Sequence, residues 1–139
     1  MYRLYTTIVI LFFTSTLFAN ASISHSQYTE LTNIVKQQQF LAKNILEEYI
    51  NFQADQKSHP KKVKMQTSIQ NFNTNHKKLI NNKNNTKIIN DKLAKVSARW
   101  KVVNNLSETK ELPSFVIASM KNINKKLKEL SKLYKATNR

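Results

Sequence analysis

The sequence predicts an all-α fold, an antiparallel up-down-up-down four-helix bundle. Three segments repeat mainly apolar residues at alternating spacings of three and four, and a fourth segment has one broad apolar face at 100° per residue; both patterns are typical of α-helices. The 139-residue chain contains no glycine, so it lacks the residue that the tight turns and bulges of an all-β fold favour. Polar connections of roughly five to nine residues separate the segments, and such short connections make consecutive helices antiparallel neighbours.

The start of the chain has the pattern of an export signal. Arg3 precedes an apolar run at 4–18, and Ala19-Asn20-Ala21 is similar to an A-x-A cleavage site. Threonine and serine residues interrupt the run, which is short for a bilayer span of about 20 apolar residues. We therefore expect a signal peptide at 1–21, cleavage after Ala21, and a single periplasmic or secreted domain at 22–139.

The first helix, expected at 27–56, has one broad apolar face. At 100° per residue this face predicts packing inside the bundle. It comprises Leu31, Ile34, Val35, Leu41, Ala42, Ile45, Tyr49 and Phe52. The cluster of lysine, serine and Pro60 after the helix marks its end, because proline disfavours helix in the residue before it.

The opposite side of this helix is of mixed character. Lys36, Gln39 and Lys43 follow one another at i, i+3 and i+7, so two cations flank an amide and predict a site for a small anion. Three apolar residues on the same side predict a dimer face: Phe40, Leu46 and Ile50. A second copy of the chain would cover that face.

Three further segments each predict an amphipathic helix. The second helix, at 61–81, has the stripe Met65, Ile69, Phe72, His76, Leu79 and Ile80. The third, which runs to about 105 with Asn85 or Thr86 as its N-cap, has the stripe Ile89, Leu93, Val96, Trp100 and Val103. The fourth, with Ser114 as its N-cap after Pro113, has the stripe Val116, Met120, Ile123, Leu127, Leu130 and Tyr134. We expect His76 to be a core or boundary residue with a hydrogen-bond partner, and Trp100 a core residue whose indole N–H faces solvent.

The net charge and the distribution of the lysines bear on which partners are expected. Lys and Arg number 23 against 8 Asp and Glu, which gives a formal net charge of +15. Loss of Arg3 with the signal peptide would leave +14. Basic proteins bind nucleic acids and anionic surfaces, but lysines that are spread over every helix are more often solvated helix faces. Nucleic acid is therefore not the expected partner.

The sequence offers little for catalysis. There is no cysteine, so disulfides and thiolate metal sites are excluded. The three histidines are isolated and the acids are scattered, without metal-ligand spacing, a phosphate-binding glycine loop or a nucleophile motif. We expect a protein that is not an enzyme and that carries no metal or cofactor.

Three segments carry a family resemblance: QQQFLAKNILEEY in the first helix, LAKVSARWKVV in the third and VIASMKNINKKLKELSKLYKA in the fourth. Together they resemble the PilJ/NarX-type extracellular sensor domain of type IV pilus chemotaxis transducers and nitrate sensor kinases. The resemblance matches Gln38, Phe40, Leu41 and Tyr49 to the family's first-helix segment, and Trp100 to the tryptophan of its third helix. The predicted ligand site comprises Lys36, Gln38, Gln39, Phe40 and Lys43.

The chain also departs from that family. Lys36 stands in place of the family's glycine, and Gln39 in place of the arginine that contacts the anion across a two-fold axis in nitrate sensors. Asn44 replaces a second arginine. Because the bidentate guanidinium contact is missing, nitrate binding is not carried over. We expect Lys36 and Lys43 to supply the charge, in a symmetric dimer whose lysines repel until an anion binds.

Two main functions follow from the sequence. The first is an exported, non-catalytic, sensor-like domain that binds a small anionic or polar ligand and acts through a membrane-bound signalling partner. The alternative is a cationic helical protein that binds a polyanion, such as lipopolysaccharide, a phospholipid surface or nucleic acid, with an affinity that falls steeply with salt. A helical adaptor or chaperone, whose partner covers the outer face of the first helix, is a third interpretation.

Overall fold

The protein is all-helical, as predicted. The computed structural model describes the backbone of residues 2–137 and the side chains of residues 26–137. The described chain forms four helices and no strand: α1 (Tyr2–Ala54), α2 (His59–Ile80), α3 (Lys87–Leu106) and α4 (Pro113–Thr137). The side chains of the predicted signal peptide and of its cleavage site after Ala21 lie outside the described residues.

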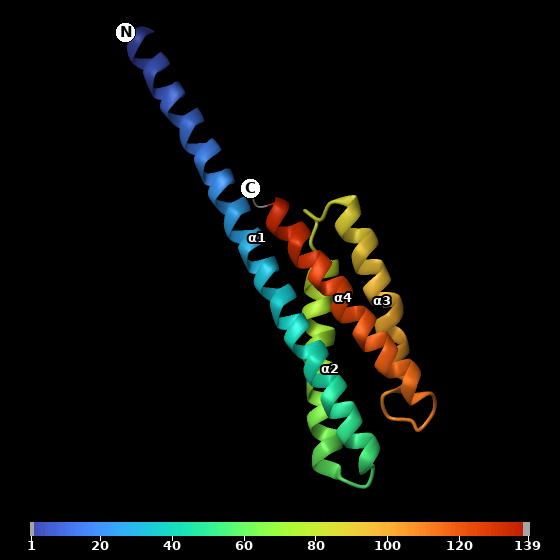
Figure 1. Ribbon diagram of the computed structural model, residues 1–139. Coiled ribbons are helices and arrows are strands. Elements are labelled where there is room, and N and C mark those ends of the chain that lie inside the picture. Colours follow the sequence, from blue (N-terminus) through green and yellow to red (C-terminus); the bar gives the residue numbers. More distant parts are fainter. Residues whose placement is uncertain (1, 138–139) are drawn as a thin grey trace.

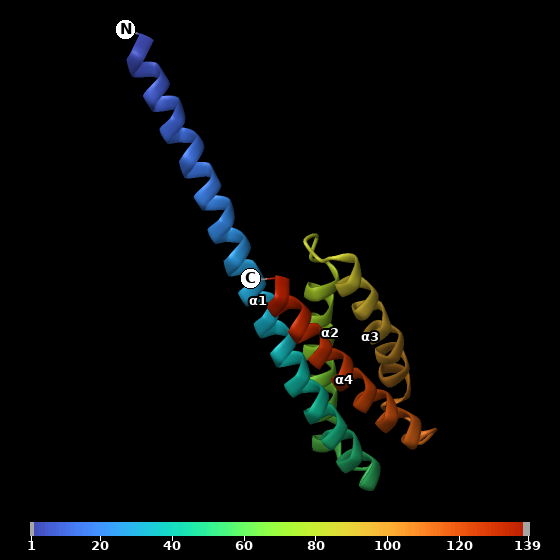
Figure 2. The same cartoon turned by 45° about the horizontal axis from the view of Figure 1, so that its top comes forward.

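The helices form an up-down-up-down bundle in which α1 and α4 are central. α1 packs against both α2 and α4, and α3 packs chiefly against α4. α2 and α3 approach each other much less closely. Both views show the N-terminal part of α1 projecting beyond the other three helices, with the end of α4 beside α1 (Figures 1 and 2). Among the residues whose side chains are described, no helix is long and apolar enough to cross a membrane.

The ends of α1 and α2 differ from the expected positions. α1 does not begin near residue 27 but continues back to Tyr2, because the intervening polar residues include neither proline nor glycine to stop a helix. α2 begins at His59 and includes Pro60 in its first turn. Proline is tolerated there because the first N–H groups of a helix have no intrahelical acceptor.

The caps of α3 and α4 give one confirmed and one wrong prediction. Thr86 is the N-cap of α3, and its hydroxyl accepts a hydrogen bond from the Ile89 N–H at 3.3 Å. Ser114 is not the cap of α4, because that helix begins one residue earlier, at Pro113, whose fixed φ suits a first helical position. The carbonyl of Leu112 accepts the N–H groups of Phe115 and Val116, with Leu112 in the left-handed region at φ 51°.

The apolar stripes meet in one core, with few exceptions. All predicted stripe residues of α3 and α4 are buried. In α1, Leu41 is only partly buried at the edge of the core. In α2, Ile80 is 45% exposed, because it lies 100° around the helix from the buried Leu79.

Candidate functional site

Three of the predicted ligand-site residues lie at the surface of α1, on the line of residues 36, 40, 43, 47 and 50 that is here called the outer ridge. Lys36 and Lys43 are exposed, and Phe40, which lies between them along the helix, is 64% exposed. Gln39 turns instead toward α4, where its Nε2 donates a hydrogen bond to the Leu127 carbonyl at 3.2 Å. The two lysines therefore flank an aromatic ring rather than an amide.

Gln38 lies in the core and not on the outer ridge. Its side chain is fully buried, and its Nε2 donates to the Phe72 carbonyl of α2 at 3.2 Å. The position follows from helical phase, since residue 38 lies seven residues before the buried Ile45. Gln38 thus ties α1 to α2 inside the core, away from the surface where the ligand site was predicted.

Only two of the three residues of the predicted dimer face lie on the surface of α1. Phe40 and Ile50 are exposed, at 64% and 49%, and lie on the outer ridge. Leu46 is partly buried and packs against the core. A surface hollow of about 350 Å³ lies beside Phe40 between α1 and α2. Its other lining residues are Gln37, Leu41, Asn71, Thr74 and Asn75.

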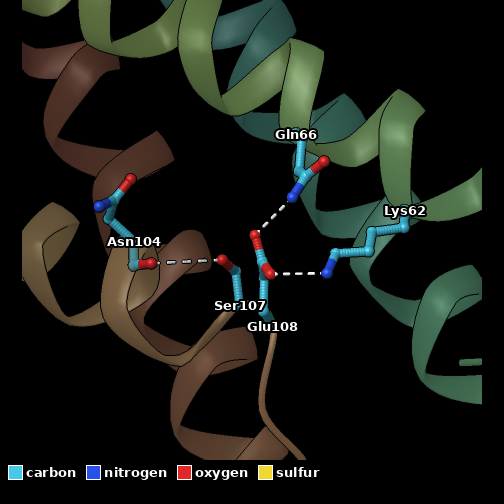
Figure 3. A network of polar contacts seen from close by, with 5 residues as sticks. All are labelled: Lys62, Gln66, Asn104, Ser107 and Glu108. Atoms are coloured by element: carbon cyan, nitrogen blue, oxygen red, sulfur yellow. Dashed lines mark hydrogen bonds and ion pairs between the residues drawn. The ribbon is translucent and has the colours of Figure 1, made fainter.

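A polar network joins the widely spaced helices α2 and α3 at one end (Figure 3). Glu108, which comes after the C-cap Ser107 of α3, accepts a hydrogen bond from the Gln66 amide at 2.6 Å and pairs with Lys62 at 2.9 Å. These contacts, led by the Gln66 hydrogen bond, lower the pKa of Glu108. The network therefore bridges α2 and the end of α3, which approach each other less closely than the other packed helices.

Aromatic residues fill the middle of the same seam. The rings of Phe72 and Trp100 stack with their centroids 4.0 Å apart. The Trp100 indole N–H donates to the Asn73 side-chain oxygen instead of facing solvent, which corrects the expectation from the sequence. Both Trp100 and His76 are buried, as predicted.

His76 has a buried, unpaired ring nitrogen. Its Nε2 lies 2.8 Å from the Ser97 hydroxyl oxygen, and that hydroxyl itself donates to the Leu93 carbonyl at 3.0 Å. With the Ser97 proton on the Leu93 carbonyl, Nε2 carries the ring proton and donates. Nδ1 is then unprotonated, and it has no hydrogen-bond partner among the described residues. Burial lowers the pKa of His76 to about 4. The expected hydrogen-bond partner is thus confirmed, and the ring is neutral at pH 7.

The outer face of α4 carries a line of exposed cations that the sequence analysis did not single out. Five lysines recur at spacings of 4, 3, 4 and 3 on the side opposite the core stripe, and all are exposed. They are Lys121, Lys125, Lys128, Lys132 and Lys135, here called the α4 lysine face. None of them makes an ion pair with a described residue. The same period that identified the core stripe would have found them.

The helix beside α4 adds to this charge. Lys92 of α3 pairs with Glu129, the only acid of α4, and its hydrogen bond is the main cause of the lowered pKa of Glu129. Lys95 and Arg99 follow Lys92 at spacings of three and four on the same side of α3, and both are exposed without an ion pair to a described residue. The one acid of α4 is thus already neutralised by its neighbour.

Charge is unevenly divided among the helices. α4 contains six lysines and one glutamate, whereas the described part of α1, from Ser26 to Ala54, contains two lysines and three glutamates. The lysines are therefore not spread evenly over the helices, as the sequence analysis expected. The positive charge is concentrated on α2, α3 and α4. Among the described residues, no group of three or more histidines, cysteines or acids could hold a metal ion.

Comparison with known proteins returns no family model, no curated protein and no solved structure that matches this chain.

Proposed function

We propose that the protein is a non-catalytic helical bundle that binds the phosphate groups of an anionic lipid surface through the α4 lysine face. The observation that carries the proposal is the line of five exposed, unpaired lysines at heptad spacing. From Lys121 to Lys135 the line extends over about 21 Å of helix. A rigid row of cations of this length contacts many anionic groups at once, and each basic residue near such a surface contributes about 1 kcal/mol.

The chemistry of the face favours headgroups over nucleobases and over insertion into the bilayer. Protein surfaces that bind single-stranded nucleic acid interleave basic and aromatic residues, so that bases can stack. Here Trp100 and Tyr134 are buried in the core, and no aromatic residue stands among the five lysines. Large apolar side chains are also absent from that line, so binding would be electrostatic and confined to the surface.

The predicted export of the protein supports a lipid partner. A periplasmic or secreted protein meets phospholipid headgroups and lipopolysaccharide, both of which present phosphate. The alternative of a free small phosphate has less support, since a flat row of lysines does not enclose a small ion.

Binding to vesicles tests the proposal. Residues 22–139 are sedimented with phosphatidylglycerol vesicles, with lipopolysaccharide and with zwitterionic phosphatidylcholine vesicles over a range of salt concentrations. We expect binding to both phosphate-bearing anionic surfaces, none to phosphatidylcholine, and a steep decrease with salt because exposed charges are screened. Tighter binding to a single-stranded oligonucleotide than to either lipid surface would contradict the proposal.

A charge-matched pair of variants localises the site. Lys125→Gln, Lys128→Gln and Lys132→Gln together remove three charges from the α4 lysine face. The control variant removes three other exposed charges, Lys77, Lys78 and Lys83, at the end of α2 and in the following loop. We expect the first variant to lose at least about tenfold in affinity, from roughly 1 kcal/mol per lysine, and the control to lose much less. Equal losses would show that only net charge matters.

The sensor-like function remains a second candidate because Lys36 and Lys43 are exposed and unpaired by described residues. In this interpretation a small anion binds on the outer ridge of α1 and the domain acts through a membrane-bound partner, as in the family that the sequence resembles. Thermal melting against a panel of small anions at fixed ionic strength tests it, since a ligand of the folded state raises the midpoint. A selective shift that Lys36→Ala with Lys43→Ala abolishes would support this function; a shift that survives would exclude this site.

A further inference from the structure

We propose that the outer ridge of α1 pairs with the same ridge of a second copy in an antiparallel helix pair, in which Phe40 faces Ile50 of the second copy and Lys43 faces its Glu47. This inference does not rest on lipid binding, which uses a different helix. It replaces the dimer face expected from the sequence, because Leu46 packs against the core and Glu47 takes its place on the ridge.

The ridge has a palindromic order of chemical types. Phe40, Lys43, Glu47 and Ile50 follow one another at spacings of 3, 4 and 3, which places them on one line of the helix. The order is apolar, basic, acidic, apolar. A two-fold axis brings the same patch of both copies together, so that if residue i contacts j, then j contacts i. In an antiparallel pair whose facing residue numbers add up to 90, Phe40 faces Ile50 and Lys43 faces Glu47. The two-fold axis repeats each of these contacts, so every residue of the line meets a complementary one.

These four side chains are free to make such contacts. Phe40 and Ile50 are 64% and 49% exposed, so both present apolar area that a partner can cover. Lys43 and Glu47 are exposed, and neither makes an ion pair with a described residue, although they stand at i and i+4 on the same helix. Pairing across the two-fold axis would satisfy both charges.

Other alignments of the two ridges are worse. A parallel pair would set Lys43 against its own copy and Glu47 against its own copy, and like charges that face each other are destabilising. An antiparallel pair shifted by one heptad, with facing numbers that add up to 83, would set Lys36 against Glu47 but Phe40 against Lys43 and Ile50 against Asn33, so that neither apolar residue of the ridge meets another. In the proposed register the next ridge residue, Lys36, faces Ala54, so no like charges meet.

Overall charge also favours α1 as the self-pairing helix. The described part of α1 is close to neutral, whereas α2 has five lysines and no acid, and α4 has six lysines and one acid. Two copies that met through α2 or α4 would repel each other. The ridge from Phe40 to Ile50 is about 15 Å long, which is small for a stable interface, so we expect a weak dimer.

Disulfide trapping tests the register, and the absence of cysteine makes the test clean. The double variant Phe40→Cys with Ile50→Cys places thiols at facing positions of the antiparallel pair. Within one chain these positions are about 15 Å apart along the helix, too far for an internal disulfide. We expect covalent dimers from the double variant under mild oxidation, and few from Phe40→Cys or Ile50→Cys alone. Efficient dimers from either single variant would indicate parallel pairing, and no dimer from the double variant would overturn the proposal.

Charge reversal tests the same contacts without cysteine. Lys43→Glu alone, or Glu47→Lys alone, sets like charges against each other at two places in the dimer. We expect each to weaken dimerisation at least about tenfold in sedimentation equilibrium, and the combined variant to recover most of the loss. Circular dichroism checks that the helices are retained. Single reversals without effect, or a combined variant that does not recover, would contradict the proposal. So would wild-type protein that stays monomeric at about 1 mM, a concentration at which a dimer with a millimolar dissociation constant is populated.

Discussion

The buried His76 should make the stability of the bundle depend on pH between neutrality and about pH 5, above the ordinary carboxyl pKa of 4.5 that applies to Glu108 and Glu129. Burial lowers the pKa of His76 from 6.5 to about 4 in the folded protein. The unfolded chain therefore binds a proton on His76 below about pH 6.5 that the folded chain does not accept until about pH 4. The stabilisation is complete above pH 6.5 and is lost as the pH falls toward 4.

The expected loss is large enough to measure. Between pH 7.5 and pH 5, the difference between the two pKa values removes ~2 kcal/mol from the free energy of unfolding. The structural reason is that a second proton would go to Nδ1, which is buried and has no acceptor. The lowered pKa values of Glu108 and Glu129 act at more acidic pH, since both lie below the ordinary value of 4.5.

Urea unfolding at the two pH values, followed by circular dichroism, is the assay. His76→Gln is expected to be less stable at pH 7.5, because the Ser97 contact is disturbed, but to lose much less stability than the wild type on acidification. His59→Gln, at the exposed start of α2, is the control and should behave as the wild type. If His76→Gln and the wild type lose the same free energy between pH 7.5 and 5, the assignment of the pH dependence to His76 is refuted.

Three further predictions concern the ends of helices, each measured by urea unfolding. Thr86→Ala should cost ~1 kcal/mol, because the Ile89 N–H loses its acceptor; Thr86→Ser should retain most of the stability. Glu108→Gln should cost less than ~1 kcal/mol, since its ion pair with Lys62 is solvent-exposed, and a loss that high salt does not reduce would argue against the ion pair. Leu112→Gly should be neutral or stabilising, because it relieves a left-handed backbone that costs ~1 kcal/mol. As a control, Ala98→Gly, at an exposed position inside α3, should cost ~1 kcal/mol.

The fold was predictable because its determinants are local and repeated. The 3-4 spacing in α4 specifies a buried face wherever the helix packs, and every residue of that stripe is buried. The N-cap Thr86 was predictable for the same reason, since a cap bonds to a group only three residues away. The start of α1 was not, because polar residues without proline or glycine neither end a helix nor require one.

The predicted ligand site depended on contacts that no local pattern contains. Gln39 bonds to Leu127, which is 88 residues away, and Gln38 bonds to Phe72, 34 residues away. A glutamine on the border of an apolar face can turn to solvent or to a neighbouring carbonyl, and only the position of the neighbouring helix decides between them. The α4 lysine face was readable in principle, but a search for apolar periodicity ignores the period of the charges.

Together, the α1 dimer and the α4 lysine face predict how a change of charge on α1 affects vesicle affinity, and the result distinguishes avidity from net charge. A dimer through α1 would carry two α4 lysine faces, and if both reach the same vesicle, the second contact is intramolecular and strengthens binding without a new kind of interaction. Glu47→Lys adds positive charge, so net charge alone predicts tighter binding to phosphatidylglycerol vesicles. If the dimer contributes avidity, the same substitution should weaken vesicle binding, because like charges then meet across the α1 pair. Tighter binding by Glu47→Lys would show that the bundle binds anionic lipid as a monomer, even where the dimer forms in solution.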